Sequence, residues 1–297
     1  MITPPFLSKN KTIGIISTAR KINKKELDPA ILFFKKHNFN IVLGKNIYKS
    51  KNQFAGNDNE RLTDLQEMFD DEKINVIICA RGGYGSIRII NKINFKKFQK
   101  NHKWIIGFSD ITVLHNYLNF NNTKSIHGPM PINFNKNSKK SLNKLISILN
   151  GEKIKYKLKS NKNNIHGKVT GMLIGGNLSI IYSMLSDKYN LKTKNKILFI
   201  EDIDEYLYHI DRMMISLKRA GKLQSIKGLI VGKMKNINDN KINFGKNYKE
   251  IIKEHVENYN YPVCFDFPSG HIKNNNPLIL GNKVTLNINN QTTLEFI

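Results

Sequence analysis

Short apolar runs rich in Ile alternate with helical runs over the first 120 residues, and this alternation limits the available folds more than any other feature. Strands are expected at residues 12–17, 40–43, 75–79 and 103–108, and helices near residues 24–37, 59–71 and 110–120. Strands separated by helices usually pair in parallel, because the helix carries the chain back to the starting edge of the sheet. The pattern therefore predicts an α/β fold with a mostly parallel sheet covered by helices.

The second half of the chain is expected to be richer in strands. A polar stretch rich in Lys and Asn, from about residue 133 to residue 164, contains one helical run and has the composition of a connection. Strand-like runs beyond it, near residues 196, 229, 263, 278 and 284, outnumber helical runs near residues 178, 206 and 248. We therefore expect an N-terminal α/β domain at 1–134, a linker region at 135–164 and a C-terminal domain at 165–297.

Ser109 lies where an apolar strand meets a helix. Residues 104–112 read as a strand, a Gly-x-Ser turn and a helix start. A sharp turn of this kind exposes the serine Oγ and directs the first helical N–H groups at whatever the Oγ attacks. The alternative is that Ser109 or Asp110 only caps the helix, since the chain lacks the last glycine of the Gly-x-Ser-x-Gly motif.

A serine hydroxyl needs a base, and the base needs a carboxylate that fixes its tautomer. The strand-like run at residues 196–200 ends in Glu201, and His271 lies in a loop rich in Gly and Pro after another strand. The order serine, acid, histidine is one of the recurrent orders for such triads. Glu205 is the competing acid, but Glu201 directly follows the apolar run and so should be held more rigidly.

A glycine-rich turn follows the strand at residues 75–79. Its spacing, Arg81-Gly82-Gly83-Tyr84-Gly85, fits neither dinucleotide nor Walker motifs, so nucleotide binding is the weaker interpretation. Adjacent glycines would let backbone N–H groups approach an oxyanion beside Ser109. The structural alternative is a plain turn before a helix over residues 86–93.

Other polar residues are expected to be structural. Asp211 and Arg212 lie in one amphipathic helical run, where an ion pair is the expected role. His115 is expected to pack in the core, and His127 lies at a strand end with no chemistry assigned. No cluster of Cys or His indicates a metal site, and no cofactor is expected.

The formal net charge of +25 raises the question of nucleic-acid or membrane binding. The lysines are spread along the chain with Asn and Ile and do not form one arm or one stripe with aromatic residues, so we expect only weak, salt-sensitive adhesion and no specific nucleic-acid partner. The N-terminus lacks the apolar region of a signal peptide, and no apolar run is long enough to span a bilayer. The two cysteines suggest no disulfide framework. A cytoplasmic protein with no membrane partner is the expectation.

Six motifs occur in a fixed order along the chain: Arg81-Gly82-Gly83-Tyr84-Gly85, Gly107-Phe108-Ser109-Asp110-Ile111-Thr112, His127-Gly128-Pro129, Gly175-Gly176-Asn177-Leu178, Glu201-Asp202 with Ile210-Asp211-Arg212-Met213, and Gly270-His271. Together they resemble the motifs of the LD-carboxypeptidase serine peptidases, a family that includes the microcin C self-immunity peptidases. The resemblance implies that Ser109 is the nucleophile, Glu201 the triad acid and His271 the base. It also implies that Gly83 and Asp110 supply the oxyanion N–H groups.

The resemblance covers nearly the whole chain but has two departures. Ser17-Thr18-Ala19-Arg20 replaces the Pro-Ser pair that usually follows the first strand, and the loop after His271 is rich in Asn. Neither departure touches the expected triad. The first suggests that the substrate-side loop differs locally.

The resemblance also implies an architecture and an activity. A flavodoxin-like N-terminal domain and a swivelling β-barrel-like C-terminal domain would flank the active site of a homodimer. The activity would be a serine carboxypeptidase that releases terminal D-alanine from murein tetrapeptide during cell-wall recycling, through an acyl-enzyme. One alternative is an amidase acting on peptidyl or aminoacyl nucleotides, and another is a non-catalytic binding protein on the same scaffold.

Overall fold

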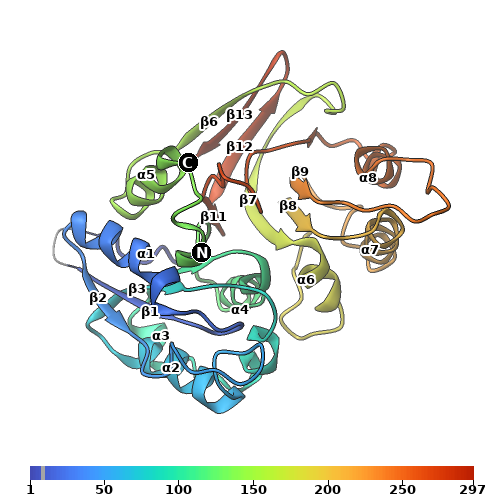
Figure 1. Cartoon of the computed structure of the whole chain (residues 1–297). Helices are drawn as coiled ribbons and strands as arrows, with labels where there is room; N and C mark the ends of the chain where they lie inside the picture. Colours follow the sequence, from blue (N-terminus) through green and yellow to red (C-terminus); the bar gives the residue numbers. More distant parts are fainter. Residues whose placement is uncertain (8–10) are drawn as a thin grey trace.

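The computed structural model describes residues 1–7 and 11–297, which form two sheets that lie side by side (Figure 1). The N-terminal part contains β1 (Thr12–Ile16), α1 (Lys24–Lys36), β2 (Asn40–Leu43), α2 (Asp58–Asp70), β3 (Ile74–Cys79), α3 (Lys96–Lys100), β4 (Trp104–Gly107), α4 (Thr112–Phe120), β5 (Ser125–His127) and α5 (Lys139–Leu149), with the 3₁₀ turns η1 (Ser86–Arg88), η2 (Ile90–Lys92), η3 (Ser109–Ile111) and η4 (Pro131–Asn133). The C-terminal part contains β6 (Lys155–Lys159), β7 (Gly167–Asn177), α6 (Leu178–Ser183), β8 (Lys196–Ile203), α7 (Leu207–Arg219), β9 (Gly228–Lys235), α8 (Tyr248–Val256), β10 (Val263–Cys264), β11 (Leu278–Leu280), β12 (Lys283–Ile288) and β13 (Gln291–Phe296).

The first sheet has the order β11-β5-β4-β3-β1-β2 and is parallel except for β11. Its central strands are apolar throughout because helices cover both faces. Ile13 and Ile15 pack on the side of α1 and α5, whereas Ile77 and Ile105 pack on the side of α2, α3 and α4. The predicted α/β fold with a parallel sheet is confirmed.

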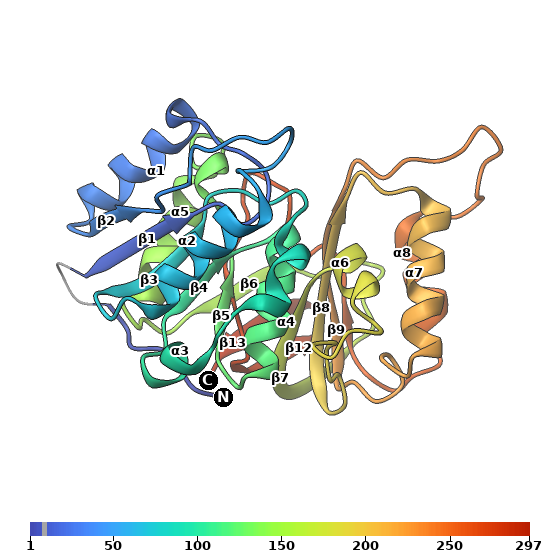
Figure 2. The ribbon, with the colours of Figure 1, turned by 90° about the horizontal axis from the view of Figure 1, so that it is seen from below.

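The second sheet has the order β10-β9-β8-β7-β12-β13-β6. Its β7 to β10 half is parallel, and α6, α7 and α8 pack on one face of it, as Figure 2 shows. Strands β12, β13 and β6 pair antiparallel. Within the described residues the strand order is open, so the sheet is mixed and no closed barrel forms.

Several local expectations were wrong because tertiary pairing overrides local pattern. Residues 86–93 form the two turns η1 and η2, and not one helix. The strand at residues 278–280 leaves the C-terminal part and joins the first sheet, antiparallel to β5. The polar stretch before residue 164 contains α5 and also β6, an edge strand that pairs with β13.

The expected ion pair between Asp211 and Arg212 is also wrong. The Asp211 carboxylate lies 2.7 Å from His255 Nε2, and the Arg212 guanidinium lies over the Tyr208 ring. Consecutive residues of a helix point in different directions, so their side chains do not face each other. His115 is buried as expected and hydrogen-bonds to Ser125 and to the Gly107 carbonyl. In the described part of the chain, no helix is long and apolar enough to cross a bilayer.

Candidate active site

Ser109 occupies a strained turn directly after β4. Its φ of 62° lies in the left-handed region, which costs a non-glycine residue about 1–3 kcal/mol. Neither Ser109 nor Asp110 caps α4, because the N-cap of that helix is Ile111 and makes no side-chain hydrogen bond. Capping therefore does not explain the serine, and the turn has the geometry that presents a nucleophile.

The glycine loop after β3 lies against this turn. A Cβ at Gly82 would lie 3.2 Å from Ser109 Cβ and 3.3 Å from Ser109 Oγ, so the loop approaches the serine closely. The buried Asp110 carboxylate accepts the Ser86 N–H at 2.9 Å and thus connects the two segments. Burial raises the pKa of Asp110. The loop and the turn are held as one unit, as an oxyanion site requires.

Glu201 and His271 form a buried pair behind the serine. His271 Nδ1 lies 2.7 Å from Glu201 Oε2, and Glu201 is fully buried. The strand register between β8 and β9 shifts at Glu201, and such irregularities often redirect a side chain beside an active site. Gly270 has a φ of 116°, and a Cβ there would lie 2.7 Å from Glu201 Oε2. Only glycine lets the histidine loop lie this close to the carboxylate.

The pair determines the charge of both groups. Burial by itself would raise the pKa of Glu201, but attraction to His271 and its hydrogen bond hold that pKa at about 2. Burial would lower the pKa of His271, but the Glu201 charge outweighs it and raises the pKa above the ordinary 6.5. His271 can therefore accept a proton near neutral pH while Glu201 stays ionised.

Two further residues surround Glu201, and the sequence reasoning gave neither a role. His127 is fully buried, with its Nε2 3.8 Å from Glu201 Oε1. Asn177 Nδ2 donates to Asp202 at 2.8 Å and lies 3.4 Å from Glu201 Oε1. The signal in the sequence was that His127 ends a strand-like run. In the structure this strand, β5, pairs with β4, and His127 lies opposite Gly107.

Glu205, the competing acid, lies elsewhere. Its carboxylate contacts His209 one helical turn further on, in the i, i+4 arrangement. It does not line the pocket that contains Ser109 and His271.

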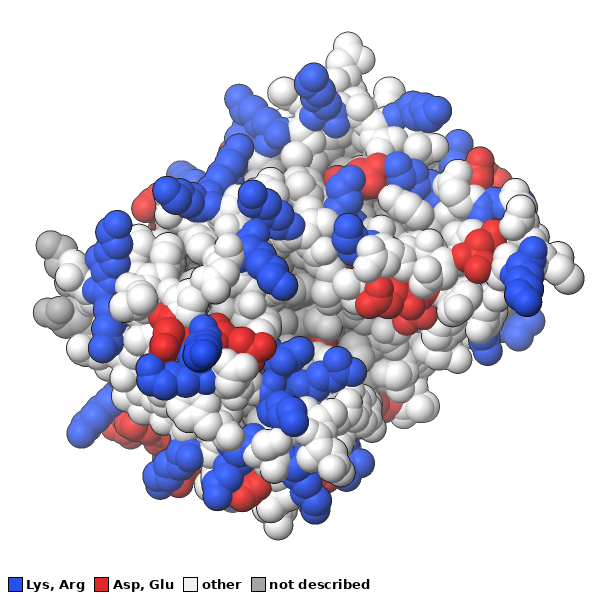
Figure 3. All heavy atoms as spheres, viewed as in Figure 1, with Lys and Arg blue, Asp and Glu red and all other residues white. Residues whose placement is uncertain are grey.

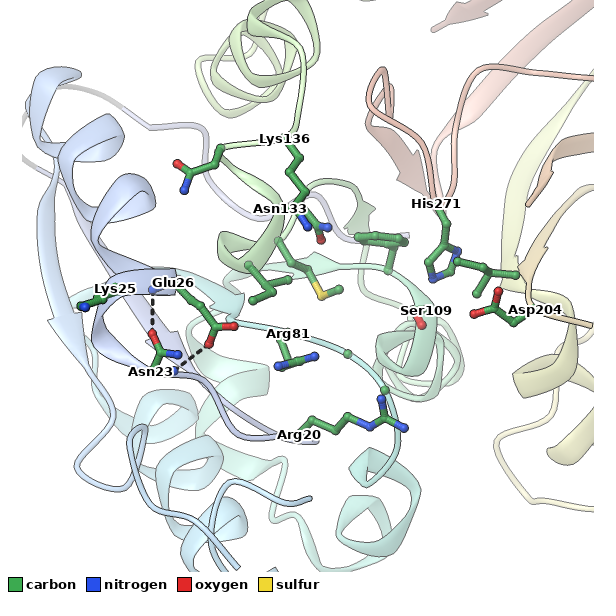
Figure 4. A pocket seen from close by; sticks show the side chains of 17 residues that line it. Arg20, Asn23, Lys25, Glu26, Arg81, Ser109, Asn133, Lys136, Asp204 and His271 are labelled. Carbon is green, nitrogen blue, oxygen red and sulfur yellow. Dashed lines mark hydrogen bonds between the residues drawn. The ribbon is translucent and has the colours of Figure 1, made fainter. Parts of the chain in front are cut away.

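Ser109 and His271 line one pocket of about 700 Å³, together with Gly83, Phe108 and Arg20 (Figure 4). The Phe108 ring meets the His271 ring edge to face, with centroids 4.8 Å apart. Glu201 lies behind His271 and not in the pocket wall, so substrate would reach the serine and the histidine but not the acid. Among the described residues, no group of His, Cys, Asp and Glu could hold a metal ion.

Charged side chains are spread over the surface of the molecule outside the pocket. On the face seen in Figure 3, Lys and Arg are scattered with Asp and Glu between them. Counterions and water screen such dispersed charges.

An α/β scaffold that presents a serine on a strand-to-helix turn, beside a histidine paired with a buried carboxylate, defines a serine-type hydrolase. Comparison with known proteins narrows the class. The family model of the LD-carboxypeptidase N-terminal domain matches residues 13–128 of the sequence, and the family model of the C-terminal domain matches residues 170–286. The chain therefore belongs to the family of serine-type LD-carboxypeptidases.

Individual relatives agree with this placement. A probable murein peptide carboxypeptidase of Bacillus subtilis is 33% identical over 303 residues, and the match covers 98% of this chain and 93% of that protein. The crystal structure of muramoyltetrapeptide carboxypeptidase from Oxalobacter formigenes superposes with a TM-score of 0.89 at 26% identity and covers 96% of this chain and 98% of that one. The microcin C7 self-immunity protein MccF shares the fold at 22% identity, with a TM-score of 0.88 and coverage of 98% and 97%.

Proposed function

We propose that this protein removes terminal D-alanine from murein tetrapeptide by cleaving the amide between an L-centre and the D-residue. The observation that carries the proposal is the strained Ser109 in one pocket with His271, which Glu201 holds from behind. The names of relatives that act on murein peptides support the substrate class.

The proposed reaction has two stages, formation of an acyl-enzyme and its hydrolysis, and His271 transfers a proton in both. His271 takes the Ser109 proton as Oγ attacks the scissile carbonyl carbon, and the N–H groups of Gly83 and Asp110 stabilise the resulting oxyanion. The C–N bond then breaks, His271 returns the proton to the leaving D-alanine amine, and an ester to Ser109 remains. Water, deprotonated by His271, attacks that ester and releases the shortened peptide. Glu201 holds the histidine tautomer and stabilises its charged form throughout.

One experiment tests the substrate. The protein is incubated with a murein tetrapeptide and, separately, with an aminoacyl nucleotide, and the products are weighed by mass spectrometry. Loss of alanine from the tetrapeptide supports the proposal. Release of nucleotide alone would favour the amidase alternative, and no turnover of either would favour a binding protein.

The pH dependence should report the His271–Glu201 pair. His271 must be neutral to accept the serine proton, and its pKa lies above 6.5 because of Glu201. We expect kcat/KM to fall as the pH drops through that raised pKa. In the residual activity of Glu201→Gln, the acidic limb should move to lower pH, because the negative charge that raised the pKa is gone. An acidic limb that stays in place in this variant would contradict the pairing.

We further propose that segment 1–134 carries the nucleophile and segment 165–297 the acid and base, and that the enzyme works as a homodimer in the cytoplasm. The family resemblance supports the division and the dimer. Two buried free thiols, Cys79 and Cys264, are compatible with a reducing compartment. Sedimentation equilibrium tests the dimer, and a mass that stays near the 34.2 kDa of one chain would contradict it.

A further inference from the structure

The pocket that holds Ser109 is lined by more cationic than anionic side chains. Its cationic side chains are Arg20, Lys25, Arg81 and Lys136, and its acids are Glu26 and Asp204. Both acids already accept hydrogen bonds: Glu26 from the Asn23 N–H at 2.9 Å, and Asp204 from Asn236 at 3.0 Å. The pocket is therefore suited to an anionic ligand.

Arg20 is the cation that lies directly on the glycine loop. Its backbone N–H donates to the Gly82 carbonyl at 3.4 Å. A Cβ at Gly83 would lie 2.5 Å from Arg20 Cδ and 2.8 Å from its Nε, so the side chain covers the Gly83 Cα. Within residues 1–7 and 11–297, the guanidinium makes no hydrogen bond or ion pair. In Figure 4, Arg20 lies across the pocket from His271.

In the proposed function, the substrate carries an anionic group, its terminal carboxylate, at a short and nearly fixed distance from the carbonyl oxygen that enters the oxyanion site. In a carboxypeptidase substrate, the terminal carboxylate is only one residue beyond the scissile carbonyl, and one residue spans at most about 3.6 Å. With the scissile oxygen at Gly83, the terminal carboxylate would therefore lie within about one residue's length of the glycine loop.

We propose that Arg20 binds the terminal carboxylate of the leaving D-residue and thereby restricts the enzyme to the free end of a peptide. This inference rests on the proposed function. A guanidinium fits a carboxylate with two parallel N–H donors, which the ammonium groups of Lys25 and Lys136 do not offer. Arg81 is the weaker candidate, because its Nη1 already donates to the Lys21 carbonyl at 3.1 Å.

The test compares how Arg20 variants and a control variant cleave a peptide with a terminal carboxylate and the same peptide without one. Wild-type protein, Arg20→Gln, Arg20→Lys and the control Lys21→Gln are assayed on a murein tetrapeptide ending in D-alanine and on the same peptide ending in D-alanine amide. Lys21 is the adjacent cation and does not line the pocket. We expect wild-type protein and Lys21→Gln to prefer the acid, by about 10- to 100-fold in kcat/KM, as for other hydrogen bonds to charged groups. Arg20→Gln should cleave both peptides equally slowly, and Arg20→Lys should restore part of the preference.

Two results would overturn the inference. The first is an undiminished preference for the acid in Arg20→Gln with an unchanged melting temperature. The second concerns the case in which wild-type protein cleaves neither peptide. The proposed function then fails independently of Arg20, and the role of Arg20 is tested by measuring peptide binding. Calorimetry on Ser109→Ala, with and without Arg20→Gln, should then show tighter binding of the acid that depends on Arg20. Equal binding of acid and amide, or no binding of either, would exclude the carboxylate role.

Discussion

Replacing Ser109 by alanine is expected to lower turnover of the tetrapeptide by about 10⁴- to 10⁶-fold, since only binding and the oxyanion site would remain to accelerate the reaction. The variant should fold normally, because alanine keeps the Cβ and the φ of 62° costs it no more than serine. Steady-state assays on variants with matched melting temperatures give the measurement. In wild-type protein, rapid quenching and intact-mass analysis should also reveal the acyl group on Ser109.

Ser109→Gly is the companion variant. It should be equally inactive yet more stable by about 1 kcal/mol or more, because glycine adopts a positive φ without the strain of a Cβ. Activity within tenfold of wild type in either variant would remove Ser109 from its proposed role. A lower melting temperature for Ser109→Gly would contradict the strained turn.

Glu201→Gln is expected to lower turnover by about 10³- to 10⁴-fold, as loss of the orienting carboxylate does in other triads. The amide is nearly isosteric, but it cannot stabilise a charged His271 and can favour the wrong tautomer. Glu205→Gln is the matched control, because that carboxylate contacts His209 and lies outside the pocket. It should change turnover by less than about tenfold.

The two glutamate variants are compared at equal fractions folded. If Glu205→Gln were the more damaging of the two, the acid would have to be reassigned. If both were harmless, the buried pair of Glu201 and His271 would have a structural role only. The assignment of Glu201 thus depends on a ranking and not on a single loss of activity.

Much of the fold could be predicted from the sequence because strand and helix periodicities are local. The alternating runs of the first sheet and the strand-to-helix turn at Ser109 follow from side-chain patterns within a few residues. Motif resemblance further indicated which serine, acid and histidine to consider. The structure brings these residues to one site, and their catalytic roles remain predictions.

The surroundings of those residues could not be predicted in the same way. Whether a strand pairs with the first or the second sheet depends on contacts between distant segments, and β11 joined the first sheet despite its position in the sequence. Likewise, no local pattern indicates that His127, which ends a strand of the first sheet, will lie beside Glu201 on a strand of the second sheet.

The sequence by itself determined the α/β class and the strand-to-helix turn at Ser109, because both depend on neighbouring residues, and it also showed the chain order of the candidate triad. Only the tertiary structure decided that Glu201 and not Glu205 lies against His271, that His127 and Asn177 surround it, and that Arg20 covers Gly83. The physical reason is that burial, pKa and hydrogen bonding depend on groups close in space. Chain folding brings such groups together from distant segments, as with Glu201 and His271, which are 70 positions apart.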